Sequence, residues 1–566
     1  MKKLPVSMSD FKKIRDENYY FVDKSLLIEE IVKAPEVCLI PRPRRFGKSL
    51  NLSMLRYYFE KKPDGSNHLP LFEGLKITQQ EGEHKKWAGQ YPVILMTFKD
   101  IKQENWEITY KKIQACISKM YLEFKYLLDS NLLIEENKTF IRKIIDYTAS
   151  QGDYENSLKY LTEFLEKHHN KKVIVLIDEY DAPIHAGYLN DYYKPIISFF
   201  RDFLSAALKE NNSLAKGIIT GILRVSKESI FSGLNNVMVY TLLMPEFSNH
   251  FGLTEEEVNT LLKNCNALKH KKNIQSWYNG YIIDNKTIYN PFSVINFLNS
   301  QDKVFRPYWL NSADNELIGK LLRKNDHSLH EEVEDLLNGK NVRSKIEESI
   351  SFQYLDNFNE KRYVWSFLLF TGYLKCEKAT DEDALESKIP IYNVSLPNEE
   401  IKLYFENYVQ IWLKNTFKNE SLETMLENLT HGKTAQFYEY FSQFVLNSFS
   451  FHDMTNKNSE AVYHAFALGL LAYLSDIYEI RSNRESGLGR YDVCLIPKNR
   501  NKLGIIMEFK ISDKESPSET LDKALAQIEE KKYATELEAV GIKNILKLAI
   551  AFKGKEVFYK ESRTSK

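Results

Sequence analysis

Residues 36–55, EVCLIPRPRRFGKSLNLSML, restrict the folds open to this chain more than any other stretch. The opening letters EVCLI are apolar and end at Pro41, which predicts a buried β-strand. Beyond the loop, Leu50, Met54 and Leu55 recur at helical spacing. The stretch therefore predicts a strand, a tight loop and a helix in direct succession, which is the local structure that a phosphate-binding loop requires.

The loop closes on Gly47-Lys48-Ser49, as in the pattern G-x-x-x-x-G-K-[ST], but Arg42 stands where that pattern has its first glycine. In such loops backbone N–H groups surround phosphate oxygens, the lysine neutralises them and the hydroxyl binds Mg²⁺. The prolines on either side of Arg42 can fix the turn, and Arg42 with its neighbouring arginines is expected to add positive charge beside the lysine. A basic surface turn is the competing interpretation, because a lone G-K-S arises often by chance.

A second predicted strand ends in acidic residues. The segment KKVIVLIDEYD, residues 171–181, is an apolar run followed by Asp178 and Glu179, and such a run suits a strand buried on both faces. In ATPases the first acid orients Mg²⁺ and the second polarises the attacking water. Thr220 ends a further strand, IITG, where a polar side chain can sense the γ-phosphate. Acids also favour helix N-caps, but both motifs at strand ends, in this order, favour an ATP and Mg²⁺ site.

The order of apolar and amphipathic segments divides the chain into three regions. Strands separated by helices predict a parallel, doubly wound α/β sheet over residues 1–245. Residues 246–434 are mainly helical and are expected to form a lid or linker, and residues 435–566 predict a small α/β domain. The strands predicted in the first region lie in 36–40, 91–98, 171–181, 215–221 and 237–243.

The third region carries a separate group of charged residues. Asp492, in GRYDVCLIP, precedes Glu508, in MEFK, by sixteen positions. Glu508 and Lys510 are i and i+2 on a predicted strand, so their side chains share a face. If the Asp492 strand pairs beside it, the carboxylates can share a divalent cation while the lysine acts on the attacking water, as phosphodiester hydrolysis requires. A surface E-x-K is the alternative, yet the apolar residues around MEFK predict partly buried charges.

Neighbouring helices offer further polar side chains. Glu460, on the helix predicted over 459–477, can add a third carboxylate, and Gln527 and Tyr533 on the following helix can position substrate or water. Alternatively, Glu460 is an ordinary acid in the first turn of a helix, where the helix dipole favours it, and Gln527 is an ordinary solvent-exposed side chain.

Charge and cysteine content exclude several classes of protein. Lys plus Arg (77) balances Asp plus Glu (77), so a nucleic-acid site would need a local cluster of basic residues. The five cysteines are far apart and form no C-x-x-C, which argues against a zinc ribbon and favours a reducing compartment. The N-terminus lacks the apolar core of a signal peptide, and the run FALGLLAYL is too short to span a bilayer. We expect a cytoplasmic protein without membrane contact.

The stretches FVDKS, RPRRFGKSLNLSML and VIVLIDEYD resemble the AAA-ATPase-like domain family, whose members carry an arginine-rich loop without the first glycine. The resemblance covers about residues 5–245 and implies an ATP-binding P-loop fold, without establishing brisk hydrolysis. Glu179 is then the catalytic candidate, and Ser49 and Asp178 are the metal ligands. The candidate nucleotide-binding residues are Arg44, Arg45, Phe46, Gly47, Lys48, Ser49, Asp178 and Thr220.

The stretches EAVYHAFALGLL, SNRESGLGRYDVCLI, MEFK and ALAQIEEKKY resemble the PD-(D/E)xK nuclease superfamily domain that accompanies that family, over about residues 455–555. The resemblance implies that Asp492 and Glu508 bind metal and that Lys510 is catalytic. Glu460 and Gln527 are carried over more weakly as catalytic residues. Tyr491 stands in place of the family's proline.

Together these patterns indicate an ATP-binding protein with Mg²⁺-dependent nuclease activity that the nucleotide regulates, with DNA favoured as the nucleic-acid substrate. The alternative is an NTP-driven switch or scaffold whose third domain binds nucleic acid or protein without cutting it. A homo-oligomer is compatible with either function.

Overall fold

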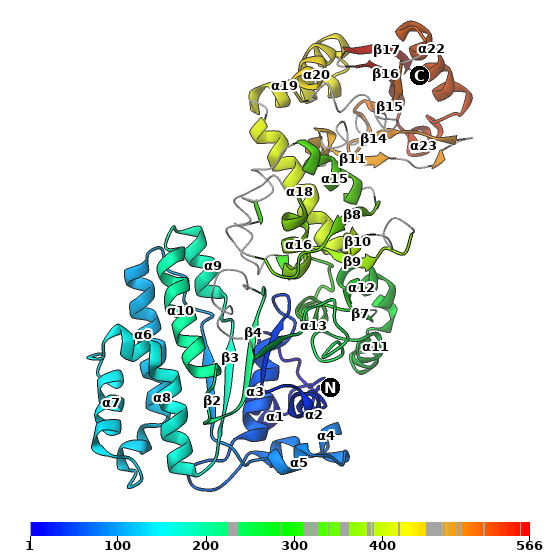
Figure 1. Ribbon diagram of the computed structural model, residues 1–566. Helices are drawn as coiled ribbons and strands as arrows, with labels where there is room; N and C mark the ends of the chain where they lie inside the picture. Colours follow the sequence, from blue (N-terminus) through cyan, green and yellow to red (C-terminus); the bar gives the residue numbers. More distant parts are fainter. Residues whose placement is uncertain are drawn as a thin grey trace. The chain divides into compact units, whose positions relative to one another are not determined.

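The chain folds into two compact units, one made of Met1–Leu329 and Gly339–Leu403 and the other of His330–Asn338 and Tyr404–Lys566. The expected division into three regions at residues 245 and 434 stays a prediction. Two helices, α15 (His327–Leu337) and α18 (Glu399–Thr416), include residues of both units. The computed structural model (Figure 1) describes residues 2–224, 236–284, 286–310, 318–319, 327–337, 339–350, 361–381, 387, 390–416, 419–448, 467, 470–474, 476–482, 485–486, 489–512, 515–554 and 556–565.

The first unit is built on a parallel five-stranded sheet with the strand order β2-β3-β4-β1-β5, which confirms the predicted α/β class. Strands β1 and β3 are buried along their whole length, because both faces of the sheet are covered. The predicted strand at 237–243 extends only to Val239, where the chain turns away. The strands are β1 (Val37–Pro41), β2 (Val93–Thr97), β3 (Val173–Asp178), β4 (Leu214–Gly221) and β5 (Val237–Val239).

The strand order determines which residues meet at the sheet edge. Because β4 lies between β1 and β3, the register places Ile40 opposite Thr220 on one side and Ile177 opposite Ile219 on the other. The carboxyl ends of these parallel strands therefore point to one edge of the sheet, and the loop after β1 begins there. Ligands of open α/β sheets bind at this edge.

Ten α-helices accompany this sheet in the described part of residues 2–224. Figure 1 shows α8 and α10 on one side of the sheet and α3 on the other. Helix α8 begins with a capping box in which Ser150 and Asp153 satisfy each other's backbone N–H groups. The helices are α1 (Phe11–Asp16), α2 (Leu27–Lys33), α3 (Lys48–Phe59), α4 (Lys76–Gln79), α5 (His84–Trp87), α6 (Trp106–Glu123), α7 (Glu135–Ile145), α8 (Gln151–His169), α9 (Ala182–Leu189) and α10 (Tyr193–Leu208).

The middle of the chain is helical, as predicted, but it also contains small antiparallel sheets that the sequence analysis did not identify. These are the pair β6-β7 and a three-stranded sheet with the order β8-β10-β9. Their strands are too short to produce a clear alternating pattern. The elements are α11 (Glu255–Asn264), α12 (Lys271–Tyr278), α13 (Pro291–Asn299), α16 (Lys361–Thr371), β6 (Tyr281–Ile283), β7 (Lys286–Ile288), β8 (Val342–Lys345), β9 (Lys375–Lys378) and β10 (Ile391–Ser395).

The second unit contains a mixed five-stranded sheet with the order β11-β14-β15-β16-β17. Strands β15 and β16 run parallel and the other neighbours are antiparallel. The strands predicted after Asp492 and around MEFK are confirmed as β14 and β15, whereas the helix predicted over 459–477 falls largely outside the described residues. The elements are α19 (Asn419–Thr430), α20 (Thr434–Ser448), β11 (Tyr478–Ser482), β12 (Glu485–Ser486), β13 (Gly489–Arg490), β14 (Val493–Pro497), β15 (Gly504–Ile511), α22 (Pro517–Glu530), α23 (Thr535–Ala539), β16 (Asn544–Lys553) and β17 (Glu556–Ser565).

Within the described ranges, no helix combines the length and the apolar character needed to cross a lipid bilayer.

Gly280 is expected to be essential for the packing between α12 and the segment before α18. Its φ is +92°, and a Cβ at this position would lie 1.9 Å from the carbonyl oxygen of Pro397. We expect Gly280→Ala to lower the free energy of unfolding by more than about 1 kcal/mol, because the substitution adds a clash to an unfavourable left-handed backbone. Gly65→Ala is the matched control, since Gly65 has a φ of +81° but open space around its Cβ position. Equal losses of thermal stability in the two variants would contradict this prediction.

Candidate functional site

The loop between β1 and α3 has the backbone of a tight turn that leads directly into a helix. Gly47 is the N-cap of α3 at a φ of +90°, and an added Cβ would meet nothing within 4 Å. Backbone conformation, and not space, therefore requires glycine here. Arg45 has a φ of +67°, which is uncommon for a residue with a side chain. Strained residues of this kind concentrate at ligand sites.

Arg42 fastens the loop to the segment after β5. Its guanidinium donates hydrogen bonds to the carbonyl oxygens of Pro41 (2.8 Å), Tyr240 (2.7 Å) and Glu246 (3.3 Å). The group also lies 5.2 Å from the centre of the Phe251 ring. The side chain is fully buried, and burial lowers its pKa to about 9. The expectation that Arg42 adds a cation beside the lysine is wrong, because its side chain is committed to the segment after β5.

Asp178 joins the end of β3 to β4 and to the first turn of α3. Its carboxylate accepts hydrogen bonds from the Ser49 hydroxyl at 2.5 Å and from the Thr220 hydroxyl at 2.7 Å. The strand order explains this meeting, because β4 brings Thr220 between the loop and the end of β3. A carboxylate beside a serine hydroxyl is a donor set that suits Mg²⁺, which prefers oxygen ligands and retains several waters.

Lys48 and Glu179 lie beside this pair. The Lys48 ammonium donates to the backbone oxygens of Arg42 and Pro43, both at 3.0 Å. Burial lowers the pKa of Lys48, and the nearby carboxylates of Glu179 and Asp178 oppose this shift. Burial also raises the pKa of Glu179, which sits at the end of β3 with a left-handed φ of +51°. A phosphate group would add a direct anionic partner to the Lys48 ammonium, whose hydrogen bonds here go to two backbone carbonyl oxygens.

A cavity of about 430 Å³ opens in front of the loop, within the size range of small-molecule sites. Lysines 99 and 102, from the segment after β2, line it together with α13, and neither contribution was predicted. They were missed because each depends on the fold bringing distant segments to the loop. Its charged lining consists of the cations Arg44, Arg45, Lys48, Lys99 and Lys102 and the acids Asp100 and Glu179. This excess of cations favours a polyanionic ligand.

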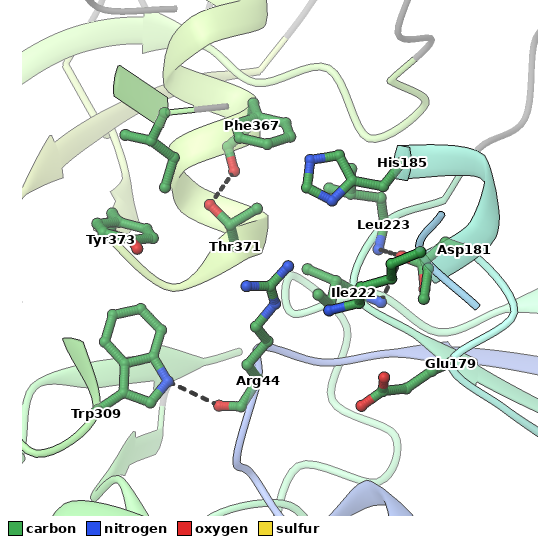
Figure 2. A pocket seen from close by; sticks show the side chains of 13 residues that line it. Arg44, Glu179, Asp181, His185, Ile222, Leu223, Trp309, Phe367, Thr371 and Tyr373 are labelled. Carbon is green, nitrogen blue, oxygen red and sulfur yellow. Dashed lines mark hydrogen bonds between the residues drawn. The ribbon is translucent and has the colours of Figure 1, made fainter. Parts of the chain in front are cut away.

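The other predicted loop residues have distinct surroundings. Arg45 places its guanidinium 4.8 Å from the centre of the Phe292 ring of α13. Phe46 is buried edge-on against Tyr281, and it lines a recess of about 80 Å³ that adjoins the cavity. Arg44 points into a smaller pocket of about 50 Å³, shown in Figure 2.

The smaller pocket contains an acidic residue that the sequence analysis did not single out. Asp181 accepts hydrogen bonds from the backbone N–H groups of Ile222 (2.8 Å) and Leu223 (2.9 Å), as Figure 2 shows. Burial nevertheless raises its pKa. Asp181 therefore fixes the segment after β4 close to Glu179.

The second predicted site is formed in the second unit. Asp492 directly precedes β14, and the register that pairs Val493 with Met507 places Asp492 next to Glu508 on β15. Asp492 accepts a hydrogen bond from the backbone N–H of Phe509 at 2.7 Å. The Lys510 ammonium lies 2.9 Å from Glu508 Oε1. The backbone register therefore brings the two acids and the lysine to one face of the sheet, as the spacing predicted.

Glu508 has a free oxygen where a cation would be expected. Its side chain is 1% exposed, and Oε2 has no hydrogen-bond partner among the described residues. Burial, reinforced by the charge of Asp492, raises the pKa of Glu508 to about 7, although Lys510 opposes the shift. A buried carboxylate oxygen without a donor is costly, and a divalent metal ion would compensate it. The residues present therefore fit Mg²⁺.

Gln527 completes this site from α22. Its amide donates to Glu508 Oε1 at 2.6 Å and to the Tyr533 hydroxyl at 3.1 Å. Tyr491, in the place of the superfamily's proline, is buried and donates to Glu536 at 2.7 Å, so it acts in packing. Glu460, the third carboxylate predicted for the site, lies outside the described residues.

Two parts of the chain match known protein families. Residues 5–231 match the family described as "Predicted AAA-ATPase", and residues 458–562 match the PD-(D/E)XK nuclease superfamily, which confirms both resemblances. A relative from Azotobacter chroococcum mcd 1, described as an uncharacterized protein in the vnfD 5′ region, is 27% identical over 332 residues, or 57% of this chain. The chain spans 56% of that relative's length.

The fastening role of Arg42 predicts an effect on stability. We expect Arg42→Met to lower the free energy of unfolding by about 1–3 kcal/mol, because buried carbonyl oxygens lose their donor. Arg45→Met, which alters only the cavity wall, should change stability much less. Thermal unfolding of the two variants measures the difference, and an Arg42→Met protein as stable as Arg45→Met would contradict the assignment.

The raised pKa of Glu508 predicts a pH-dependent affinity for metal. Below about pH 7 the carboxyl group holds a proton that Mg²⁺ must displace, and above this pH it does not. We expect the apparent Mg²⁺ affinity to rise by about tenfold per pH unit up to pH 7 and then to level off. Calorimetric titrations across this range, with Glu508→Gln subtracted to exclude Mg²⁺ bound elsewhere, measure the effect. An affinity independent of pH would speak against Glu508 as a ligand.

Proposed function

We propose that this chain, in which an AAA-ATPase-like domain is joined to a PD-(D/E)XK nuclease superfamily domain, cleaves nucleic acid under the control of a bound nucleotide. The observation that carries the proposal is the unpartnered, buried oxygen of Glu508 beside Asp492 and Lys510. DNA is the proposed substrate. The five cysteines are all unpaired, which supports a reducing, cytoplasmic location.

In the proposed nuclease site, Asp492 and Glu508 would hold Mg²⁺. The bound ion would polarise the scissile phosphate and lower the pKa of a coordinated water. Gln527 holds Glu508 Oε1, which leaves Oε2 for the ion. Lys510 lies on the same strand face as Glu508 and would hold the attacking water and offset the charge that develops on the phosphate.

In the proposed nucleotide site, the ligand is ATP. Lys48 would neutralise phosphate oxygens, with Arg44, Arg45 and the two lysines after β2 around them. Ser49 and Asp178 would hold Mg²⁺, with Thr220 fixing the carboxylate. Glu179 would orient an attacking water.

The base would occupy the recess of about 80 Å³ that adjoins the cavity. The two spaces share Pro5, Gly47, Leu50, Pro291 and Ile295, so a ligand whose phosphates lie at Gly47 can extend into the recess. The wall of the recess is largely apolar, which suits an aromatic base.

A cleavage assay with two variants tests the proposal. The full chain is incubated with plasmid, linear duplex or single-stranded DNA, with Mg²⁺, and with or without ATP. Glu508→Gln should cut at least about a hundredfold more slowly, as expected for loss of a group that acts at the reacting centre. Lys48→Ala should bind ATP more weakly and lose the effect of ATP on cleavage. Asp522→Asn, an exposed acid of the same domain paired with Lys560, is the matched control.

Two results would contradict this function. Cleavage by Glu508→Gln at the rate of the unaltered chain would remove the nuclease assignment. An unaltered chain that shifts DNA in a gel but never cuts it with Mg²⁺ or Mn²⁺ would favour the switch or scaffold.

A further inference from the structure

Trp309 supports the nucleotide loop from the middle of the chain. Its ring is 1% exposed, and its indole N–H donates to the carbonyl oxygen of Arg44 at 3.0 Å, as Figure 2 shows. The loop touches the same region at Gly372, where an added Cβ would lie 2.9 Å from Pro43 Cβ. The loop therefore rests on Trp309 and on the residues that follow α16.

Glu400 holds Trp309 in turn. The backbone N–H of Trp309 donates to Glu400 Oε1 at 2.6 Å, and the Ser293 hydroxyl donates to Oε2 at 2.8 Å. Glu400 is 0% exposed. Burial raises its pKa to about 7. A buried carboxylate is destabilising unless its hydrogen-bond partners remain in place. Moving Ser293 away from Trp309 would break one of the hydrogen bonds to Glu400, so this movement is unfavourable.

Both partners of Glu400 are connected to elements that line the nucleotide cavity. Ser293 belongs to α13, whose residues Pro291, Phe292 and Ile295 line the cavity. Trp309 binds the loop, whose residues Arg44 and Gly47 line the same cavity. A ligand that contacts the loop and α13 together would therefore fix both segments that Glu400 connects.

Glu400 also belongs to the first turn of α18. Asn398, just before this helix, accepts from the backbone N–H of Ile401 at 3.1 Å and donates to the carbonyl oxygen of Asn279 at 2.7 Å. Helix α18 begins in the first unit and continues, from Tyr404 on, within the second. Its first turn is thus tied to the cavity walls, and its remainder belongs to the unit with the nuclease site.

We propose that Glu400 and Trp309 are positioning residues that transmit occupancy of the nucleotide cavity to the first turn of α18. The proposal rests on the nucleotide site proposed above. Binding that fixes the loop and α13 stabilises the Glu400 contacts, and by linkage a stabilised first turn raises the affinity for nucleotide. This coupling is the route by which nucleotide changes the rate of cleavage.

Hydrogen exchange of the full chain, with and without ATP and Mg²⁺, measures the coupling directly. In the unaltered chain, ATP should slow exchange both in the loop, residues 42–52, and at residues 399–403. In Trp309→Phe and Glu400→Gln, saturating ATP should still protect the loop but no longer protect residues 399–403. The Kd for ATP should rise about fivefold or more, the usual lower range of coupling between sites.

The rate of DNA cleavage distinguishes a loss of coupling from a general loss of stability. Both variants should cut DNA at the unaltered rate without ATP, while the ratio of the rates with and without ATP falls towards one. Trp365→Phe is the matched control, because Trp365 is equally buried, at 1% exposed, and lines neither cavity. Ser293→Ala, which removes a single donor from Glu400, replaces Glu400→Gln if that protein does not fold.

The outcomes separate the two proposals. ATP that protects the loop of the unaltered chain but not residues 399–403 would overturn the coupling and leave the nucleotide site standing. Variants that retain the full response to ATP would also overturn it. Absence of any protection in the loop would overturn the nucleotide site and, with it, the coupling.

Discussion

Removing a carboxylate from water is costly unless donors or a cation compensate it, and this constraint shapes each of the sites in the chain. Asp178 is buried between two hydroxyl groups at the edge of the first sheet. Glu400 is buried between a donor from α13 and the backbone N–H of Trp309, whose indole binds the nucleotide loop. Glu508 is buried with one oxygen satisfied and one left over. Protein donors compensate Asp178 and Glu400, whereas one oxygen of Glu508 has no donor among the described residues.

The sequence predicted well those features that depend on local pattern or on adjacent strands. The apolar runs before Pro41 and Asp178 predicted buried strands, since only a covered sheet suits them. The spacing of Glu508 and Lys510 predicted a shared face, because side chains alternate along a strand. Asp178 lies at the end of a strand, and Glu508 and Lys510 lie on a strand. At such positions the direction of a side chain follows from the strand register.

Features that depend on distant segments could not be predicted in this way. Lys99, Lys102 and α13 reach the nucleotide cavity only through the arrangement of the whole first unit. The pairing of Trp309 with Glu400 joins residues 91 positions apart, and neither residue belongs to a motif. The role of Arg42 was predicted wrongly. Its position in the loop motif suggested a cation beside the lysine, whereas its burial depends on contacts with the chain near residue 240.

The position of Arg42 limits how this loop can be exchanged for that of another protein. A conventional glycine-rich loop would remove the guanidinium that ties the end of β1 to Tyr240 and Glu246. Any graft would therefore have to redesign the segment after β5 at the same time, since its carbonyl groups would otherwise be buried without donors. The loop and the segment after β5 therefore have to be altered together, because the carbonyl oxygens of one are satisfied by a side chain of the other.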